Sequence, residues 1–455
     1  MATYSVIQKS QLEGAHRLDA EYYQPEYLEI AALLDKVDWK KLSEVAIIRS
    51  GTTPKDRDDE QREGVVLLKT TDIRNNTLPL ENNYYYVSDK IASRMKKTEL
   101  LEKDVLINIV GATLGVIGRV AFVPQRFPKA NITQAMALVR TKDKSFLNEF
   151  VFAFLISKYG RLQADRLARP TGQYNLNLEE LSSFRIPTIS LGKQEIIKNL
   201  IENSEEKLLI SQSLYNQAEN LLLEELGLKN FEAENKLWSV IELSEVKKAN
   251  RIDAEYFQPK YEELESKIKK YEHKPLEGVL ENVSAKFDPI KQPDKNFKYV
   301  ELSNINASIG IIDGFSEILG KEAPNRARRV LKENDVIASS VQGSLEKASL
   351  VHENQKDFLA STGFFQFRSK EILPEALLIL AKSIVFQWQL EKRCAGTILT
   401  AVPKESINDI LIPILPKPIQ EKIADLVQKS HESREEAKAL LEEAKRKVEE
   451  MIENK

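Results

Sequence analysis

A glycine-bearing stretch, GATLGVIGR at residues 111–119, is the part of this sequence that comes nearest to a phosphate-binding loop. It lacks the lysine and the hydroxyl residue with which a GxxxxGKS or GxxxxGKT loop holds nucleotide phosphates and magnesium. No GxGxxG motif opens a helix, and the histidines are scattered without the spacing of zinc ligands. The acidic residues of SGTTPKDRDDE, at residues 50–60, are typical of an exposed loop. We therefore expect neither catalytic residues nor a metal site, and we expect a chain that binds.

The composition is that of a globular protein. The chain has 455 residues, more than one core usually holds, so we expect roughly two to four domains. Its single cysteine, Cys394, excludes an internal disulfide framework and thiolate metal clusters. No apolar run approaches the ~18 residues of a membrane span and no signal-peptide pattern opens the chain, so we expect a cytoplasmic protein. The formal net charge is −3, yet residues 41–186 hold 23 Lys and Arg against 17 Asp and Glu. This balance predicts a basic first globular segment.

The elements that must position any binding residues occur twice. RLDAEYYQPEY at residues 17–27 returns as RIDAEYFQPKY at residues 251–261, with eight of eleven positions identical. LEKDVLI at residues 101–107 corresponds to KENDVIA at residues 332–338, and FRIPTISLGKQEII, ending at Ile197, corresponds to ILIPILPKPIQEKI, ending at Ile423. The order is the same in both copies. An internal repeat over the whole chain is therefore predicted.

Each copy divides into three parts. Short apolar runs broken by Gly, Pro and Asn predict β-rich globular segments, and each segment closes with a helix before an Ile-Pro strand. We predict an α+β fold with two globular β-rich domains separated by two long antiparallel helices in a pseudo-twofold repeat. The predicted parts are an N-terminal segment at 1–39, a first globular domain at 40–187, a central region at 188–273 with a long helix at 192–228, a second globular domain at 274–413, and a C-terminal helix at 414–455.

The two long helices share a heptad seam. Its members are spaced alternately four and three residues apart, and small residues stand at matching places. In the first helix they are Ile197, Ile201, Ser204, Leu208, Ser211, Tyr215, Ala218 and Leu222; in the second they are Ile423, Val427, Ser430, Arg434, Ala437, Leu441, Ala444 and Val448. We predict that the helices pack against each other as an antiparallel pair. The alternative is two separate surface helices, each with an amphipathic stripe.

The repeated segments, the two globular parts and the matching helices together resemble the specificity subunit of type I restriction-modification systems. The resemblance covers nearly the whole chain. Its most specific elements are the eleven-residue segments, LSSFRIP and INDILIP before each helix, and the QEII and QEKI helix starts. It implies two target recognition domains joined by conserved helices, each domain recognising one half of a split double-stranded DNA sequence.

The same resemblance implies partners and excludes catalysis in this chain. A specificity subunit assembles with two methylation subunits, which use S-adenosylmethionine, and with restriction subunits, which use ATP and magnesium. No cofactor is expected in this chain itself. A helix of about 36 residues is about 54 Å long, enough to hold two domains over major-groove faces about 34 Å apart. Because the two globular sequences differ, we predict an asymmetric target.

Candidate DNA contacts are polar residues in loops that a sheet positions, since Arg, Lys, Asn, Gln, Ser and Thr bind base edges and phosphates. In the first domain they are Ser50, Thr52, Thr53, Lys55, Lys69, Thr70, Thr71, Arg74, Asn108, Thr113, Arg169, Thr171, Gln173 and Tyr174. In the second they are Asn304, Asn306, Ser340, Gln342, Ser344, Lys347, Thr362 and Thr397. The alternative for each is a solvated or turn-stabilising side chain.

Three further arginines and the repeated aromatic residues have separate expectations. Arg326, Arg328 and Arg329 are predicted to contact phosphates, because clustered charge gives affinity without sequence information. The aromatic residues around Tyr22, Tyr23 and Tyr27 are predicted either to bury against the end of the opposite long helix or to contact the methylation subunit.

Two other function classes compete with this interpretation. One is a coiled-coil adaptor with β-rich domains that binds no DNA. The other is a nucleic-acid-modifying enzyme separated from its catalytic domain, which the absence of a cofactor motif in the sequence disfavours.

Overall fold

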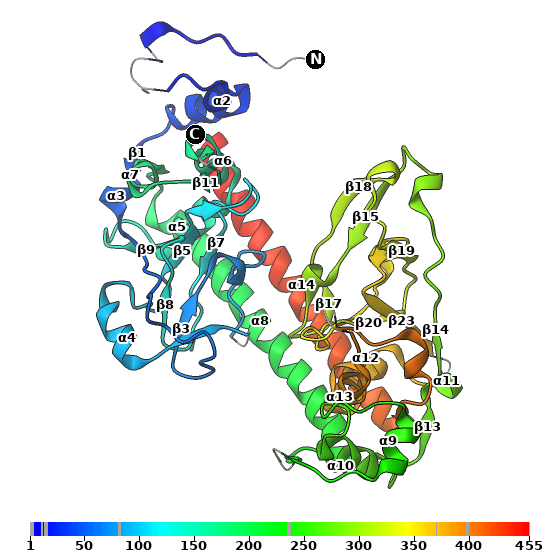
Figure 1. Ribbon diagram of the computed structural model, residues 1–455. Coiled ribbons are helices and arrows are strands. Elements are labelled where there is room, and N and C mark those ends of the chain that lie inside the picture. The colour runs from blue at the N-terminus through cyan, green and yellow to red at the C-terminus, as the bar shows by residue number, and fades with distance from the viewer. Residues whose placement is uncertain are drawn as a thin grey trace. The chain divides into compact units, whose positions relative to one another are not determined.

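The computed structural model describes residues 4–10, 12, 17–80, 83–170, 172–233, 238–369, 371–396 and 400–454 (Figure 1). The chain forms two compact units. The first unit comprises Met1–Lys207 and Glu435–Lys455, and the second unit comprises Leu208–Arg434. Within the described residues, no helix combines the length and the apolar character that crossing a membrane requires.

The first unit is built around a four-stranded antiparallel sheet with the order β2-β9-β5-β7. A second sheet has the order β4-β3-β8, and its β3 and β8 pair in parallel. The smaller sheets are β1-β12 and β10-β11-β6. The strands are β1 (Trp39–Lys41), β2 (Ala46–Ser50), β3 (Val65–Leu68), β4 (Tyr85–Val87), β5 (Val105–Asn108), β6 (Val110–Gly111), β7 (Val120–Phe122), β8 (Ala130–Ile132), β9 (Met136–Thr141), β10 (Arg169–Pro170), β11 (Tyr174–Asn175) and β12 (Arg185–Pro187).

The second unit repeats this plan. Its largest sheet has the order β14-β23-β20-β21-β17-β16, a second has the order β18-β15-β22-β19, and β13 pairs with β24. Here β15 pairs in parallel with β22, and β17 pairs in parallel with β21. The strands are β13 (His273–Pro275), β14 (Leu280–Asn282), β15 (Asn296–Val300), β16 (Ile305–Asn306), β17 (Ile311–Ile312), β18 (Ser316–Leu319), β19 (Ala327–Val330), β20 (Val336–Ser339), β21 (Ala348–Leu350), β22 (Leu359–Ser361), β23 (Phe364–Ser369) and β24 (Leu411–Pro413).

Helices complete each unit in the same order. The longer ones are α2 (Pro25–Leu34), α5 (Asn148–Ile156) and α6 (Lys158–Leu167) in the first unit, and α10 (Pro259–Ile268), α12 (Pro374–Lys382) and α13 (Ile384–Arg393) in the second. Short helices are α3 (Leu42–Val45), α4 (Asp89–Arg94), α7 (Leu178–Ser182), α9 (Leu243–Ala249) and α11 (Leu276–Val279).

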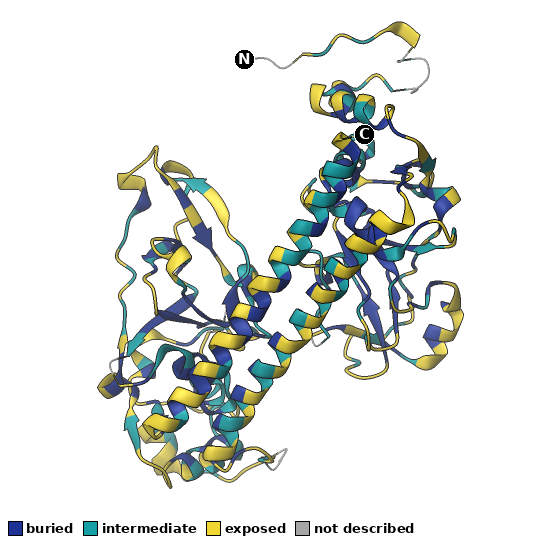
Figure 2. Cartoon of the chain, turned by 180° about the vertical axis from the view of Figure 1, so that it is seen from behind, coloured by how far each residue is buried: buried dark blue, intermediate teal, exposed yellow. Residues whose placement is uncertain are grey.

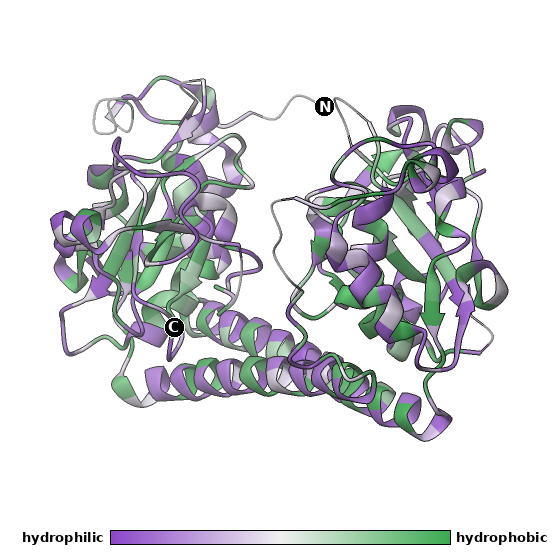
Figure 3. Ribbon diagram, turned by 60° about the horizontal axis from the view of Figure 1, so that its bottom comes forward, coloured by the Kyte–Doolittle hydropathy of each residue, from purple (hydrophilic) through white to green (hydrophobic). Residues whose placement is uncertain are grey.

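The central strand of each unit is buried on both faces. In β5, Val105 and Ile107 pack in one hydrophobic cluster with helix α5, whereas Leu106 between them packs in another cluster with strands β3 and β8. Successive strand residues point to opposite faces, so the sheet lies between a helix and a second sheet. In β20, Val336 and Ile337 divide between two clusters in the same way. Figure 3 shows hydrophobic colour along the sheet strands of both units.

The two long helices are α8 (Leu191–Glu225) and α14 (Lys417–Glu453), and they run antiparallel. In the first unit, Ser204 Oγ donates to the carbonyl of Ala437 at 2.8 Å. In the second, Ser430 Oγ donates to the carbonyl of Ser211 at 2.7 Å. Residue numbers therefore increase along α8 in the direction in which they decrease along α14. This confirms the predicted antiparallel pair and the α+β fold class.

The heptad seam is the buried stripe of this pair. All of its sixteen positions are buried except Leu208 and Leu441, which are half-buried, and the outer faces are exposed (Figure 2). Helix α8 ends at Glu225 rather than at residue 228 as predicted. Gly227 adopts a left-handed φ of 60°, and the Leu228 amide donates to the carbonyl of Leu223 at 2.7 Å. This C-terminal cap stops the helix.

Candidate nucleic-acid interface

Three of the four candidate loops in the first unit are joined by hydrogen bonds. Asn108 Nδ2 donates to the carbonyl of Thr70 at 3.0 Å, which ties the loop after β5 to the loop after β3. Tyr174 in β11 pairs with Gly111 in β6, which adds the loop between α6 and α7. Segments far apart in the sequence therefore present their polar side chains at one edge of the unit.

The fourth loop, which begins at Ser50, is fixed to the end of β8. The Thr52 amide donates to the carbonyl of Ile132 at 3.0 Å. A Cβ atom at Gly51 would lie 1.9 Å from that same carbonyl oxygen. Only glycine permits this approach, so Gly51 determines where Thr52 and Lys55 stand. Since β8 pairs with β3, this loop lies beside the loop that follows β3.

The predicted contacts of the first unit differ in exposure. Those that are exposed are Thr52, Lys55, Thr71, Arg74, Thr113, Arg169 and Gln173; those half-buried are Ser50, Thr53, Lys69, Thr70 and Tyr174. Asn108 is fully buried, and its amide also donates to the carbonyl of Val116 at 3.2 Å. It therefore positions two loops and offers no surface to a ligand in this structure. Thr171 lies outside the described residues.

Two arginines of the first unit have contrasting surroundings. Arg169 Nε lies 2.6 Å from Glu180 Oε1, so its charge is partly neutralised although half of the side chain is exposed. Arg74 stands at a two-residue turn in which Asn75 and Asn76 have φ angles of 46° and 60°. The Thr77 amide closes this turn onto the carbonyl of Arg74 at 2.9 Å. Asparagine tolerates this conformation, and the turn leaves Arg74 exposed.

An exposed aromatic residue flanked by cations was missed in the sequence. Tyr85, on the edge strand β4, is 42% exposed, and Lys69 Nζ lies 3.5 Å from its ring centre. In the second unit Phe315, just before β18, is 43% exposed, and Lys298 Nζ lies 4.8 Å from its ring centre. Aromatic faces beside cations suit both base stacking and phosphate contact. The run of three tyrosines at residues 84–86 was the available signal.

Several candidates of the second unit stabilise their own turns. Asn304 Oδ1 accepts from the Glu301 amide at 2.9 Å, and Asn306 Oδ1 accepts from Ser308 Oγ at 2.6 Å. Ser344 Oγ donates to the carbonyl of Val341 at 3.0 Å. These three side chains thus have the turn-stabilising role that was the alternative in the sequence.

The other candidates of the second unit are more varied. Gln342 and Thr362 are exposed. Lys347 is half-buried and contacts another residue. Ser340 is buried, and its hydroxyl donates to the carbonyl of Gly363 at 2.9 Å. The Gln342 amide donates to the carbonyl of Thr400 at 3.0 Å, which brings two of the predicted loops together. Thr397 lies outside the described residues.

The three clustered arginines are not equivalent. Arg326 is exposed, and Arg328 forms an ion pair of 2.6 Å with Asp288. Arg329 is only 4% exposed and lines a cavity of about 390 Å³ together with Ser340 and Thr362. A surface phosphate is therefore accessible to Arg326, while Arg329 is accessible only through that cavity.

Among the described residues, no cluster of three or more His, Cys, Asp or Glu side chains is placed to bind a metal ion. The candidate surface thus consists of hydrogen-bond donors, cations and aromatic faces, and it suits binding of a polar, anionic partner.

Comparison with known proteins identifies a similar domain in the first half of the chain. Residues 35–220 match the family model described as the type I restriction modification DNA specificity domain. The match covers less than half of the 455 residues, so it assigns a type I restriction modification DNA specificity domain to residues 35–220. The resemblance stated from the sequence motifs is confirmed.

Individual relatives are distant. The type I restriction enzyme EcoBI specificity subunit of Escherichia coli is 26% identical over 144 residues, which are 32% of this chain and 29% of that relative's length. The type I restriction-modification S subunit from M. genitalium is 15% identical, with a TM-score of 0.40 over 91% of this chain and 96% of that one. The HsdS subunit from Thermoanaerobacter tengcongensis is 14% identical, with a TM-score of 0.28 over 91% of this chain and 95% of that one.

The eleven-residue segments contact the end of α6 in the first unit and the residue after α13 in the second. Arg17 forms a forked ion pair with Asp19 and stacks on Tyr22, and Arg166 of α6 also stacks on Tyr22. In the second copy Arg251 pairs with Asp253 in the same way, and its Nη2 donates to the carbonyl of Cys394 at 2.9 Å. Arg166 Nε also donates to the carbonyl of Tyr22 at 3.2 Å, so Tyr22 contacts the short helix α6. Burial of the tyrosines against the end of the opposite long helix stays a prediction.

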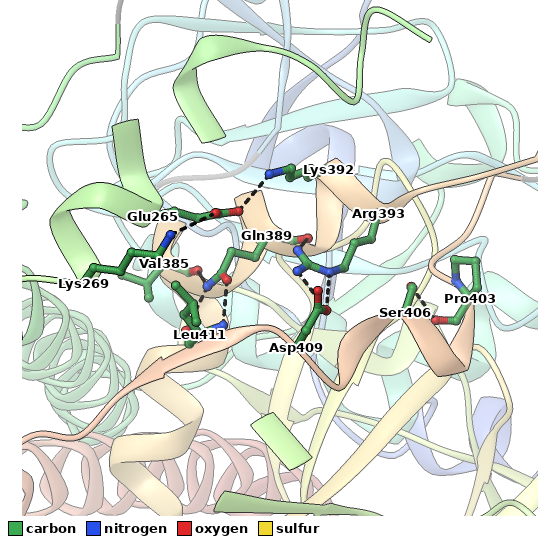
Figure 4. A network of polar contacts seen from close by, with 10 residues as sticks. All are labelled: Glu265, Lys269, Val385, Gln389, Lys392, Arg393, Pro403, Ser406, Asp409 and Leu411. Atoms are coloured by element: carbon green, nitrogen blue, oxygen red, sulfur yellow. Dashed lines mark hydrogen bonds and ion pairs between the residues drawn. The ribbon is translucent and has the colours of Figure 1, made fainter. Parts of the chain in front are cut away.

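The glutamines of the QEII and QEKI helix starts are buried clamps. Gln194 accepts from the Leu147 amide at 2.8 Å, and Gln420 accepts from the Leu373 amide at 2.9 Å. Each joins the start of α8 or α14 to the start of a globular helix, α5 or α12. Another buried glutamine, Gln389, joins α13 to Leu411 of β24 by two hydrogen bonds (Figure 4). The motifs that identify the specificity family therefore hold the architecture together.

Proposed function

We propose that this chain recognises a split, asymmetric duplex DNA sequence with its two globular domains and positions methylation and restriction subunits on it. One observation carries the proposal: equivalent loops share a backbone but differ in side chains. The Lys69 amide donates to Asp72 at 2.9 Å, and the Glu301 amide donates to Asn304 at 2.9 Å, so both turns close alike. The same backbone with different donors and charges supports two different half-sites.

We propose the domain boundaries given above as the functional ones, with recognition domains at 40–187 and 274–413. Pairing of β1 with β12 supports the first, since Lys40 lies opposite Ile186. Pairing of β13 with β24 supports the second, since Lys274 lies opposite Ile412. Each domain begins and ends on one two-stranded sheet, as a module that can be exchanged would.

We propose that two copies of the methylation subunit bind at equivalent surfaces of the two repeats. Leu18 is 86% exposed and its counterpart Ile252 is 89% exposed. The pattern extends further than the eleven-residue segment, because Val6 and Val240 are also exposed at the same spacing. Large apolar side chains exposed in pairs at equivalent positions support one kind of partner bound twice. Catalysis, S-adenosylmethionine, ATP and magnesium then belong to the partner subunits, and the assembly acts in the cytoplasm.

Selection of duplexes from a random library by the chain assembled with its methylation subunits tests DNA recognition. We expect a motif of two different short half-sites separated by unspecified bases. Replacing residues 40–187 with the corresponding segment of another specificity subunit should change one half-site and keep the other. A soluble assembly that enriches no sequence would contradict the proposal and favour the adaptor alternative.

The partner surfaces need a separate test. Leu18→Asp and Ile252→Asp should each leave an assembly with one methylation subunit instead of two, as measured by native mass spectrometry. Ala254→Asp, another exposed position of the same segment, is a matched control for added charge. Retention of two subunits by the doubly substituted chain would contradict this assignment.

A further inference from the structure

The second unit contains a cavity in which three cationic side chains and three hydroxyls stand beside the apolar residues Ala285, Phe364, Phe365 and Val402. It measures about 390 Å³, and Lys286, Arg329 and Lys404 line it beside the hydroxyls of Ser284, Ser340 and Thr362. No carboxylate is among the residues that line it. Three positive charges without a compensating acid, in a space much larger than the ~30 Å³ share of one water molecule, indicate a site for an anion.

Arg329 has the least satisfied charge of this lining. It is 4% exposed, and its Nη1 donates to the carbonyl of Val283 at 2.5 Å. Its Nε is buried and has no hydrogen-bond partner among the described residues. Burial alone lowers the pKa of this guanidinium to about 10. A buried charge is normally paired, so an external anion is the missing partner.

Other buried charges of the second unit show the contrast. Asp335 is fully buried, and Arg368 Nε lies 2.5 Å from its Oδ1. Arg434 is 9% exposed and lies 3.2 Å from Asp313. Each of these buried charges therefore has an oppositely charged partner within the unit, although Arg434 Nε, like Arg329 Nε, has no hydrogen-bond partner among the described residues. Arg329 forms no such pair within the described part of the chain, so its burial has no internal explanation.

The first unit is built differently at the corresponding place. Counting back from Asp104 and Asp335, the position that matches Arg329 is Thr98. Thr98 is buried, and its hydroxyl donates to the carbonyl of Met95 at 3.1 Å. At this position of the repeat, the first unit has a hydroxyl with a hydrogen-bond partner, Thr98, and the second has a guanidinium without a carboxylate partner among the described residues, Arg329.

We propose that this cavity binds a phosphate group of the DNA backbone, with Arg329, Lys286 and Lys404 as its ligands. The inference rests on the proposed function. The cavity borders the candidate interface. Ser340 and Thr362 are predicted contacts that also line the cavity, and the Thr362 amide donates to the carbonyl of the exposed Arg326 at 2.8 Å. A phosphate held here fixes the register of the duplex on the second domain without specifying a base.

The test uses the full chain assembled with its methylation subunits and a duplex enriched in the selection described above. Lys286→Gln with Lys404→Gln removes two ligands while leaving the buried Arg329 in place. Each neutralised phosphate contributes a slope of about 0.9 to the dependence of log K on log salt concentration. We expect the slope to fall by about one in the double variant, and to stay unchanged in Lys417→Gln, a control whose side chain is 82% exposed on α14.

Two further arms separate the sources of the anion. A neutral methylphosphonate is placed at one backbone linkage of the duplex at a time. At one linkage it should lower the affinity of the wild type and leave the affinity of the double variant unchanged. An unchanged salt slope in the double variant, with normal wild-type binding, would overturn the proposal. Stabilisation of the wild type alone by inorganic phosphate, with no change in the slope, would also overturn it and assign the cavity to a free anion. A wild-type assembly that binds no duplex would instead refute the proposed function.

Discussion

Replacing Asp335 with asparagine should destabilise the second unit without altering the first. Asp335 is fully buried, and its carboxylate accepts from Arg368 Nε at 2.5 Å, from Gln366 Nε2 at 2.6 Å and from the Lys332 amide at 2.8 Å. An amide in its place turns one acceptor into a donor facing other donors, and it leaves the Arg368 guanidinium unpaired.

The magnitude follows from the burial of the pair. Removing one partner of a buried ion pair costs about 3–5 kcal/mol. The Arg368 side chain is 29% exposed, so water screens part of its charge. We therefore expect a loss of about 3 kcal/mol in the free energy of unfolding. Replacing both partners, in Asp335→Leu with Arg368→Met, should recover part of that loss because no unpaired charge remains, although Gln366 Nε2 and the Lys332 amide lose their acceptor.

Hydrogen exchange followed by mass spectrometry measures this unit by unit. Peptides from residues 330–369 should exchange faster in Asp335→Asn, while peptides from residues 100–141 stay unchanged. Asp104→Asn is the matched variant in the first unit, because Asp104 is 3% exposed and Arg140 Nη2 lies 2.6 Å from it. It should give the opposite pattern. A loss below about 1 kcal/mol for Asp335→Asn would refute the argument from the buried pair.

Three further outcomes are expected. Burial lowers the pKa of His431 to about 4 from its ordinary 6.5, so the unfolded chain binds the proton first and stability falls as pH drops from about 6.5 towards 4. That loss is about 3 kcal/mol at most. The free energy of unfolding, measured as a function of pH, should show it in the wild type and not in His431→Phe. Equal acid sensitivity of the two proteins would contradict this prediction. Ser211→Leu overfills the helix seam, where Ser211 Oγ lies 3.2 Å from Ser430 Oγ, and should lower the unfolding free energy by about 1–3 kcal/mol, whereas an increase in melting temperature would contradict close helix packing. Gln420→Ala leaves the Leu373 amide without its acceptor and should cost about 1–3 kcal/mol in chemical denaturation, and a neutral result would show that the clamp is dispensable.

The helix pair could be predicted because its signal is local. A heptad seam depends on residues three and four apart. The small residues at matching places in the two copies, Ser204 with Ser430 and Ser211 with Ala437, lie at the contacts between α8 and α14. The parallel pairing of β3 with β8 could not be predicted in this way, since it joins segments more than sixty residues apart. The repeat guided the positions of the strands but not their neighbours.

The candidate interface was predictable only as a set of loops. Residue type alone does not separate Asn108 and Asn306, whose amides hold turns and loops, from Arg74 and Thr113, which are exposed. That distinction depends on backbone atoms contributed by other segments. The cationic cavity could not be predicted from the sequence, because it brings together residues 286, 329 and 404, which are far apart in the chain.

The most direct measurement is the methylation pattern of the DNA of a host that expresses this chain with its methylation subunits, determined by single-molecule sequencing. The account predicts a split, asymmetric adenine-methylated motif that disappears when this chain is omitted. A motif that persists without this chain, or two identical inverted half-sites, would contradict recognition by two different domains.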